Sequence, residues 1–504
     1  MDRTKHLCVT YDGVLKFKGD DQYYEWNNSF KDEDVQALED FVASHIMNRG
    51  RATLISLSEG THNRVARFRL ELGGSDAALK FPKPGHSAGT LAAEKVTNEA
   101  AWLVYLKEKT IIPVPHVYSC HTKPELSLLK VPSILMEWMP GENLRDFLAS
   151  KSSKRIRSTI YQQLASVYLQ LYKLTFDGIG SVAKDSKTKQ WGLQRPLTID
   201  MHQSVLGISN YLTDDWPTEE FKTAKEYLDF VSDQQSQQLW KLLNINTTDE
   251  DENQDPPISF KEIARARYEA RYRFKELCNT QFGLQDNSGP FRAFIPDIDM
   301  CNMTVDTATG HILGVFDLEF ANTMPAQFAC DPPLSLSTVL PGTALKNGTF
   351  DKFLSEYKPL LAQFLGAMRQ EERKLGNMQK PLSAMMQDSW ATKQVWVNFG
   401  LTHSRYVDAI YWKVLHDRHR GGISPELPLK VKEGMEVYVQ QSEGQIEQYD
   451  DSLILYSNKV AATHDSMDYN EMGERAFRDA AARDSERFCQ WLSLTYKLPR
   501  RVKN

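Results

Sequence analysis

The sequence predicts an α+β protein in which a small antiparallel β-sheet precedes a larger, mostly helical part. Three short segments, 53–57, 65–72 and 77–81, are predicted to be strands; the second alternates apolar and polar residues, and glycine-containing turns separate the three. This pattern is typical of β-hairpins. From about residue 144 onward, longer segments repeat apolar residues at helical spacing, which is typical of helices that bury one face.

The composition indicates a globular chain with enough apolar residues for a sizeable core. Of its 504 residues, 41% are hydrophobic and 25% are charged, which are ordinary proportions for such proteins. A net charge of −6 gives no overall attraction to nucleic acid. The six cysteines lie far apart without metal-ligand spacing, so we expect reduced, mostly buried thiols and no zinc site.

The chain also lacks the usual signals for membranes and export. No apolar run approaches the roughly 20 residues that span a bilayer. The first residues lead into Asp12, Asp20 and Asp21, which is too acidic for a mitochondrial presequence and lacks the apolar segment of a secretory signal. We therefore expect a cytoplasmic protein with no membrane or nucleic-acid partner.

Around the predicted sheet, we expect helices at 30–46 and 91–107 and a short strand at 134–136. An acidic run at 246–257 has almost nothing to bury and is predicted to be a solvated loop. Further helices are expected at 144–150, 155–174, 221–243, 258–278, 350–375, 383–418 and 466–496.

The most informative stretch begins with Asp297, which is followed five residues later by Asn302. Two short apolar runs, 303–305 and 312–316, then form a tight hairpin that ends at Asp317. A loop followed by such a hairpin brings the three side chains to one rim. Phosphoryl transfer needs this set, because one carboxylate orients the attacking hydroxyl while an amide and a second carboxylate hold magnesium on the phosphates.

The stretch from 289 to 325 resembles the catalytic and metal loops of protein-kinase-like phosphotransferases, and specifically those of the aminoglycoside phosphotransferase-like family. The resemblance covers about residues 50–420 and implies a two-lobed protein-kinase-like fold. The motifs also resemble a fungal branch of this family that includes proteins named for altered inheritance of mitochondria. The runs that carry it are 80–85, 94–99, 112–115, 289–291, 316–320, 325–328, 364–369, 382–383, 389–390 and 411–412.

The resemblance implies a role for several residues by position. Lys80 would bind the α- and β-phosphates of ATP and Glu99 would anchor it. Asp297 would orient or deprotonate the acceptor hydroxyl, while Asn302 and Asp317 would bind Mg²⁺. Glu94 lies on the same predicted helix, but Glu99 has the family's spacing to the Ile-Pro-Val-Pro run that starts at residue 112.

Two further features resemble the family and also have ordinary structural interpretations. The backbone groups of Glu137 and Met139 would face the adenine at the hinge between lobes, or they are simply a strand end and a turn. The turn at 59–63 would cover the phosphates, but with one glycine it is a poor phosphate loop.

The family pattern is not complete. Ile295 stands where the family usually has His, which puts the geometry of the catalytic loop in question, and Leu318 replaces a common Trp. The role of Glu319 stays open between support of the site and contact with a substrate.

The sequence thus predicts transfer of the γ-phosphoryl group of ATP to a hydroxyl or amino group of a small molecule. The alternative, motivated by Ile295 and the glycine-poor turn, is a pseudokinase or nucleotide-binding scaffold that acts through protein partners. The expected organisation is an N-terminal extension at 1–50, an N-lobe at 51–138, a C-lobe at 139–425 and a helical C-terminal extension at 426–504.

Overall fold

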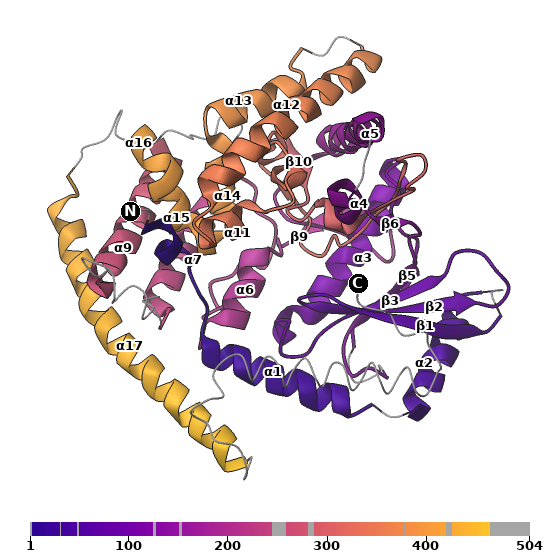
Figure 1. Ribbon diagram of the computed structural model, residues 1–504, viewed down its shortest axis with the longest axis horizontal. Helices are drawn as coiled ribbons and strands as arrows, with labels where there is room; N and C mark the ends of the chain where they lie inside the picture. Colours follow the sequence, from indigo (N-terminus) through magenta and orange to yellow (C-terminus); the bar gives the residue numbers. More distant parts are fainter. Residues whose placement is uncertain are drawn as a thin grey trace.

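The computed structural model describes residues 3–30, 32–47, 50–123, 128–150, 154–243, 259–280, 287–376, 379–419 and 426–463. Within these ranges, an antiparallel sheet forms the core of a small N-terminal lobe, and helices make up most of the larger second lobe (Figure 1). The two-lobed, kinase-like fold class predicted from the sequence is confirmed. The predicted acidic loop at 246–257 and the predicted helix at 466–496 lie outside the described residues.

The N-terminal lobe contains a five-stranded sheet with the strand order β1-β2-β3-β5-β4. Helix α2 (Asp32–His45) covers one face of this sheet, where Val42 packs in the same buried cluster as Leu79. Helix α3 (Ala92–Lys109) lies on the other face with Ala78. The strands are β1 (Ala52–Glu59), β2 (Asn63–Leu70), β3 (Ala77–Pro82), β4 (Val117–His121) and β5 (Ser133–Glu137).

Lys80 lies in the middle strand of this sheet, where its backbone pairs with Val65 on one side and with Ile134 on the other. Successive side chains of a strand point to opposite faces. Leu79 and Phe81 face α2, so the Lys80 side chain points toward α3. The alternation of β3 therefore decides which helix the lysine meets.

The second lobe combines helices with three small sheets. Two of these sheets, β13-β10-β7 and β12-β11-β6, support the loop that carries Asp297. The strands are β6 (Glu142–Asn143), β7 (Thr175–Phe176), β8 (Ser181–Lys184), β9 (Trp191–Gln194), β10 (Phe291–Phe294), β11 (Met303–Val305), β12 (Ile312–Val315) and β13 (Asn322–Met324). The helices are α4 (Leu144–Ser150), α5 (Lys154–Lys173), α6 (Ile199–Gly207), α7 (Ala224–Lys241), α9 (Phe260–Thr280), α10 (Ala326–Ala329), α11 (Pro341–Lys346), α12 (Phe350–Lys374), α13 (Leu382–Ala391), α14 (Gln394–Thr402), α15 (Val407–Ile410), α16 (His416–His419) and α17 (Leu429–Thr463).

The single helix predicted at 383–418 is wrong. The chain instead forms α13, α14, a 3₁₀ turn η6 (Ser404–Tyr406), α15, a π-helical turn η7 (Tyr411–Leu415) and α16. Lys393, between α13 and α14, has a φ of +61°, which ends a right-handed helix. The apolar pattern continues across these breaks because α13, α14, α15 and η7 each bury residues in the same core.

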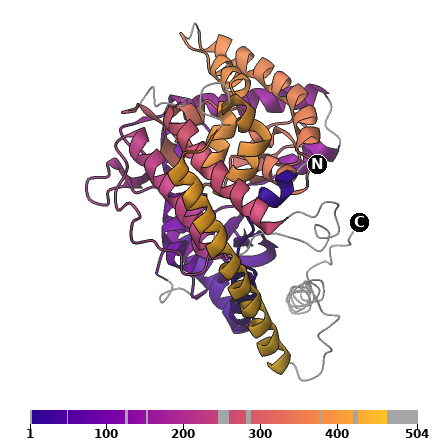
Figure 2. The same ribbon diagram turned by 90° about the vertical axis from the view of Figure 1, so that its left-hand side faces the viewer.

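The N-terminal segment links the two lobes, which the sequence did not indicate. Its 3₁₀ turn η1 (Arg3–Leu7) packs on α9, α11 and α15, and helix α1 (Gly13–Asn28) contacts α6 and α17. At the other lobe, Asp20 lies 2.6 Å from Nε2 of His86. Figure 1 shows α1 running below both lobes, and Figure 2 shows the length of α17 along the side of the molecule.

No helix in the described ranges is both long enough and apolar enough to cross a membrane.

Candidate functional site

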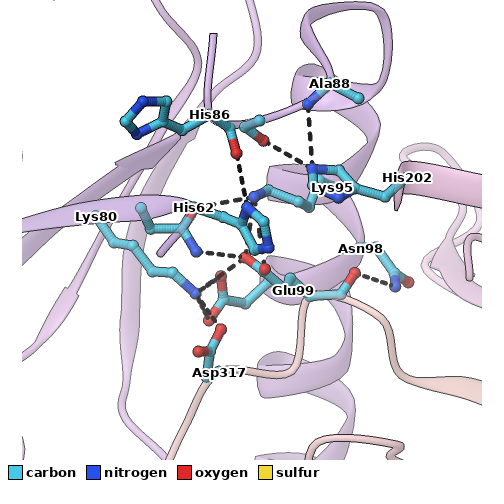
Figure 3. A network of polar contacts seen from close by, with 12 residues as sticks. His62, Lys80, His86, Ala88, Lys95, Asn98, Glu99, His202 and Asp317 are labelled. Carbon is cyan, nitrogen blue, oxygen red and sulfur yellow. Dashed lines mark hydrogen bonds and ion pairs between the residues drawn. The ribbon is translucent and has the colours of Figure 1, made fainter. Parts of the chain in front are cut away.

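Lys80 is at the centre of a buried cluster of charges between the two lobes. Its Nζ lies 2.7 Å from a carboxylate oxygen of Glu99 on α3 and 2.6 Å from Oδ1 of Asp317. A third carboxylate, on Glu319, is 3.4 Å away. Figure 3 shows Lys80 extending from its strand toward Glu99 and Asp317. The lysine thus joins the sheet, α3 and the segment after β12.

A second lysine, Lys95, approaches the same carboxylates from the N-terminal half of α3. Its Nζ lies 3.4 Å from Glu319 and donates a hydrogen bond of 3.0 Å to Oδ1 of Asn63. The side-chain amide of Asn63 in turn donates to Oε2 of Glu319 at 2.9 Å. Lys95 was not among the predicted site residues, although its position four residues before Glu99 places both on one face of a helix.

The Glu94 side chain lies elsewhere, because it is paired with Arg195. Of the two glutamates that the sequence offered on this helix, Glu99 contacts Lys80.

The charges of this cluster do not sum to zero, and the pKa values of its lysine and carboxyl groups are shifted as a result. Burial lowers the pKa of Lys80, but Asp317, Glu99 and Glu319 outweigh it and raise the pKa well above its usual range. Burial raises the pKa of Glu99 to about 7 despite the opposing effect of Lys80. Since three carboxylates share two lysines, one negative charge is in excess, and a proton on the deeply buried Glu99 would neutralise it.

The pKa of Glu319 is shifted in the opposite direction from that of Glu99. Burial acts to raise its pKa, but Lys95 and Lys80, together with the hydrogen bond from Asn63, lower it below the usual range. Glu319 is therefore ionised at neutral pH, and its hydrogen bond with Asn63 holds the β1–β2 turn next to the Lys80 cluster. This arrangement favours support of the site as the role of Glu319.

The loop before β11 brings Asp297 and Asn302 next to each other. The side-chain amide of Asn302 donates to the backbone carbonyl of Asp297 at 2.9 Å, and the backbone carbonyl of Asn302 accepts from the Phe316 N–H at 3.1 Å. Asp317 directly follows Phe316 and has a φ of +67°, a strained conformation for a residue other than glycine. Asp297, Asn302 and Asp317 therefore lie at one end of the β11–β12 hairpin.

Ile295 does not weaken this loop by exposing an apolar side chain, because it is buried in the core. Its carbonyl accepts a hydrogen bond from the Ile298 N–H at 3.2 Å. Asp299 receives the Cys301 N–H at 3.0 Å and pairs with Arg145. Apolar packing, a backbone turn and an ion pair thus hold the loop in place.

Asp297 is the carboxylate on the exposed side of the site. Crowding by the surrounding protein raises its pKa to about 7, and the negative charges of Asp317, Asp299 and Glu319 act in the same direction. Because Asp297 is exposed to solvent, hydration offsets part of the effect of burial on its pKa. The repulsion from the neighbouring carboxylates remains. A carboxylate with a pKa near neutrality is suited to accept a proton from a substrate.

The predicted hinge lies where β5 ends. The N–H of Glu137 is used by the carbonyl of His116 at 2.8 Å, and its carboxylate accepts from Ser75 at 2.8 Å. Across the described ranges, no hydrogen bond engages the N–H of Met139. Gly141 follows with a φ of +103°, so the chain turns sharply into the second lobe at a position that only glycine adopts without strain.

The turn between β1 and β2 contacts the segment before α3 and helix α6 through His62. Nδ1 of His62 is 2.6 Å from the carbonyl of His86, and the His62 ring packs against His202 of α6 at 4.9 Å. Nε2 of His202 accepts the Ala88 N–H at 3.1 Å. Figure 3 shows these contacts above the Lys80 cluster, so the turn is tied to both lobes.

Oxygen ligands for a cation are present in the site. Glu99, Asp317 and Glu319 each offer a carboxylate oxygen within 4.8 Å of the other two, but Lys80 occupies the space between them. Asp317 and the side-chain oxygen of Asn302 could hold Mg²⁺, since this ion is usually held by one or two protein oxygens plus phosphates and water. The chemistry of these residues fits such an ion.

Comparison with known proteins supports the predicted family for part of the chain. Residues 53–252 match the model of the phosphotransferase enzyme family, APH. This segment is less than half of the 504-residue chain and ends before Asp297. No curated protein sequence matches the chain.

Several solved structures resemble the chain at low identity. A candidate aminoglycoside phosphotransferase from Ralstonia eutropha JMP134 is 11% identical, with a TM-score of 0.39 over 82% of this chain and 98% of its own. ADP-bound aminoglycoside phosphotransferase APH(2'')-Ib is 13% identical, with a TM-score of 0.36 over 83% and 99%. The ternary complex of APH(2'')-IIa with streptomycin and ATP is 12% identical, with a TM-score of 0.35 over 75% and 94%. The fungal branch is not tested by these matches and stays a prediction.

Proposed function

We propose that this protein is an ATP-dependent phosphotransferase that acts on a hydroxyl or amino group of a small molecule. The observation that carries the proposal is the position of Lys80, which lies within 2.7 Å of both Glu99 and Asp317. A lysine held by a buried glutamate and next to a metal-binding aspartate is the arrangement that positions ATP phosphates in this class of enzyme. The match of residues 53–252 to the phosphotransferase family adds support.

Asp297 is the proposed base. It accepts the hydroxyl proton of the acceptor while the acceptor oxygen forms a bond to the γ-phosphorus. The bond between that phosphorus and the β–γ bridging oxygen breaks at the same time, and ADP leaves. The raised pKa of Asp297, about 7, allows it to hold and release this proton near neutral pH.

The other residues bind and orient ATP. Lys80 faces the α- and β-phosphates, Glu99 fixes its ammonium group, and the backbone of Glu137 and Met139 faces the adenine. Asn302 and Asp317 would hold Mg²⁺, which when bound neutralises negative charge on the phosphate oxygens.

A second candidate function is a nucleotide-binding scaffold without transferase activity. It is favoured by the direct 2.6 Å contact between Lys80 and Asp317, which must loosen before Asp317 binds a metal. The hydrogen bonds of Asn63 to Glu319 and Lys95 also hold the β1–β2 turn close to the Lys80 cluster, where the phosphates of ATP would bind.

Two measurements test these proposals. The first is thermal unfolding with and without ATP and Mg²⁺. A ligand at 100 times its Kd stabilises the folded state by about 2.7 kcal/mol, so wild type should shift upward and Asp317→Asn should shift much less. If wild type does not shift, both proposals are wrong.

The second measurement is ATP consumption by the purified protein in the presence of a metabolite library. Asp297→Asn should keep the ATP-dependent thermal shift but lose turnover. Equal ATP turnover in wild type and Asp297→Asn would favour the scaffold over the enzyme.

A further inference from the structure

A cavity of about 300 Å³ lies in the second lobe, and Asp297 forms part of its wall. This volume is at the small end of the range for small-molecule sites, about 300–1,000 Å³. If Asp297 is the base, this cavity is the site of the phosphoryl acceptor, so the inference below depends on the proposed function. Its aromatic walls are formed by Tyr168, Tyr172, Phe294, Phe328, Phe399 and Tyr406.

Apart from Asp297, the carboxylates that line the cavity already have partners. Asp299 is paired with Arg145. Asp331 accepts hydrogen bonds from Ser389 at 2.6 Å and from Asn398 at 2.9 Å. The cavity therefore lacks the group of available carboxylates that several ammonium groups of one ligand would need.

The cavity does contain a cation whose carboxylate partner is missing. Arg405 of η6 lines it. Within the described part of the chain no acidic side chain lies at ion-pair distance from its guanidinium, and the nearby charge of Asp200 acts on it only from farther away. The buried Nε of Arg405 has no hydrogen-bond partner in that part of the chain. The carboxylate of nearby Asp200 is directed to Ser404, whose N–H and Oγ donate to it at 3.0 and 2.7 Å. Four other arginine Nε atoms in the described residues share this state, so the Arg405 donor matters because it belongs to the cation that lines the cavity.

The guanidinium of Arg405 is held in place by two aromatic rings. It lies 5.2 Å from the ring centre of Tyr406 and 5.2 Å from that of Tyr11. Each ring sits directly on a glycine: a Cβ at Gly342 would be 2.5 Å from Tyr406, and a Cβ at Gly207 would be 2.3 Å from Tyr11. Arginine stacked in this way loses little freedom when it binds a planar anion.

We propose that the phosphoryl acceptor is an anionic, hydroxyl-bearing small molecule with a flat or apolar body. Its carboxylate-type or phosphate-type group binds Arg405, its body packs on the aromatic walls, and its hydroxyl faces Asp297. A polycationic aminoglycoside is disfavoured, because it would place ammonium groups near Arg405 without carboxylates to receive them.

The charge class of the acceptor can be measured without knowing its identity. A small-molecule cell extract is divided by ion exchange into anionic, cationic and unretained fractions, and each is incubated with the protein and ATP labelled in the γ-phosphate. We expect labelled product from the anionic fraction. Product from only the cationic or the unretained fraction overturns the proposal and leaves the proposed function intact. Labelling of none of the fractions overturns both.

The role of Arg405 is then tested with the labelled acceptor. Arg405→Gln should raise the KM for the acceptor at least tenfold while the KM for ATP stays the same, and Arg405→Lys should recover part of the loss. Arg265→Gln is the matched control, since Arg265 is exposed on α9 and pairs with Glu436. Unchanged KM values in Arg405→Gln, or an equal loss for both substrates, overturn the assignment. Midpoints of thermal unfolding show whether each variant is folded.

Discussion

The Lys80 cluster makes a quantitative prediction about stability and pH. Lys80→Met removes one of two lysines that face Glu99, Asp317 and Glu319, so the excess of negative charge rises from one to two. The Lys80 side chain is only 7% exposed, and removal of one partner from a buried pair costs about 3–5 kcal/mol. We expect a loss of this size at pH 8.

The loss should depend on pH in a definite direction. Burial raises the pKa of Glu99 from 4.5 to about 7, and removal of the neighbouring cation raises it further. A carboxyl whose pKa is higher in the folded than in the unfolded state destabilises the fold as pH rises through that interval. The deficit of Lys80→Met should therefore shrink as pH falls from 8 to about 7, by up to about 1.4 kcal/mol per pH unit for each extra proton bound. Below about pH 7 Glu99 is protonated in wild type as well, so the deficit should then change little.

The assay is denaturant unfolding of both proteins at several pH values between 5 and 8. Lys184→Met serves as a control, because Lys184 pairs with Glu108 at the surface and such pairs contribute only about 0–1 kcal/mol. The reasoning is refuted if Lys80→Met is as stable as wild type at pH 8, or if its deficit grows as pH falls.

Three further predictions concern the rate of transfer, a buried ion pair and the turn between the lobes. If Asp297 is the base, kcat/KM for the acceptor should rise about tenfold per pH unit below pH 7 and level off above it, since the pKa of Asp297 is about 7. Asp297→Asn should lower the rate by roughly 10²–10⁴ and remove this pH dependence. Arg271→Met leaves the fully buried Asp408 without its partner and should reduce the free energy of unfolding by about 3–5 kcal/mol, measured by denaturant unfolding. Gly141→Ala should lower the free energy of unfolding by an amount on the order of 1–3 kcal/mol in the same assay, because Gly141 has a φ of +103° and a backbone carbonyl lies 2.7 Å from the new Cβ. Gly89→Ala is the control: its Cβ meets nothing within 4 Å, so it should be nearly neutral.

The sequence alone determined the fold class and the local placement of several groups. Alternation in β3 decides that Lys80 points to the face opposite Leu79, and helical spacing puts Lys95 and Glu99 on one side of α3. The hairpin after Asn302 follows from two short apolar runs and a turn. These features were predictable because each depends on which face of one element is buried, and that information is local.

Contacts within the Lys80 cluster required the tertiary structure. The spacing of residues suggested that Glu99 meets Lys80, and the structure brings them within 2.7 Å. Nothing local indicated that Asn63 and Lys95 would bind Glu319, because these residues come from a strand, a helix and a loop that are far apart in the chain. The breaks within 383–418 were also missed, because the apolar pattern continues through them.

The surroundings of Arg405 show most clearly what only the fold decides. Tyr11 comes from the N-terminal segment and Tyr406 from η6, yet both hold one guanidinium. Their approach depends on two glycines in α6 and α11, which in the sequence are ordinary small residues. Periodicity records whether a side chain is buried, but it does not record which distant side chain shares its space, and that choice is made when the lobes and the N-terminal segment pack together.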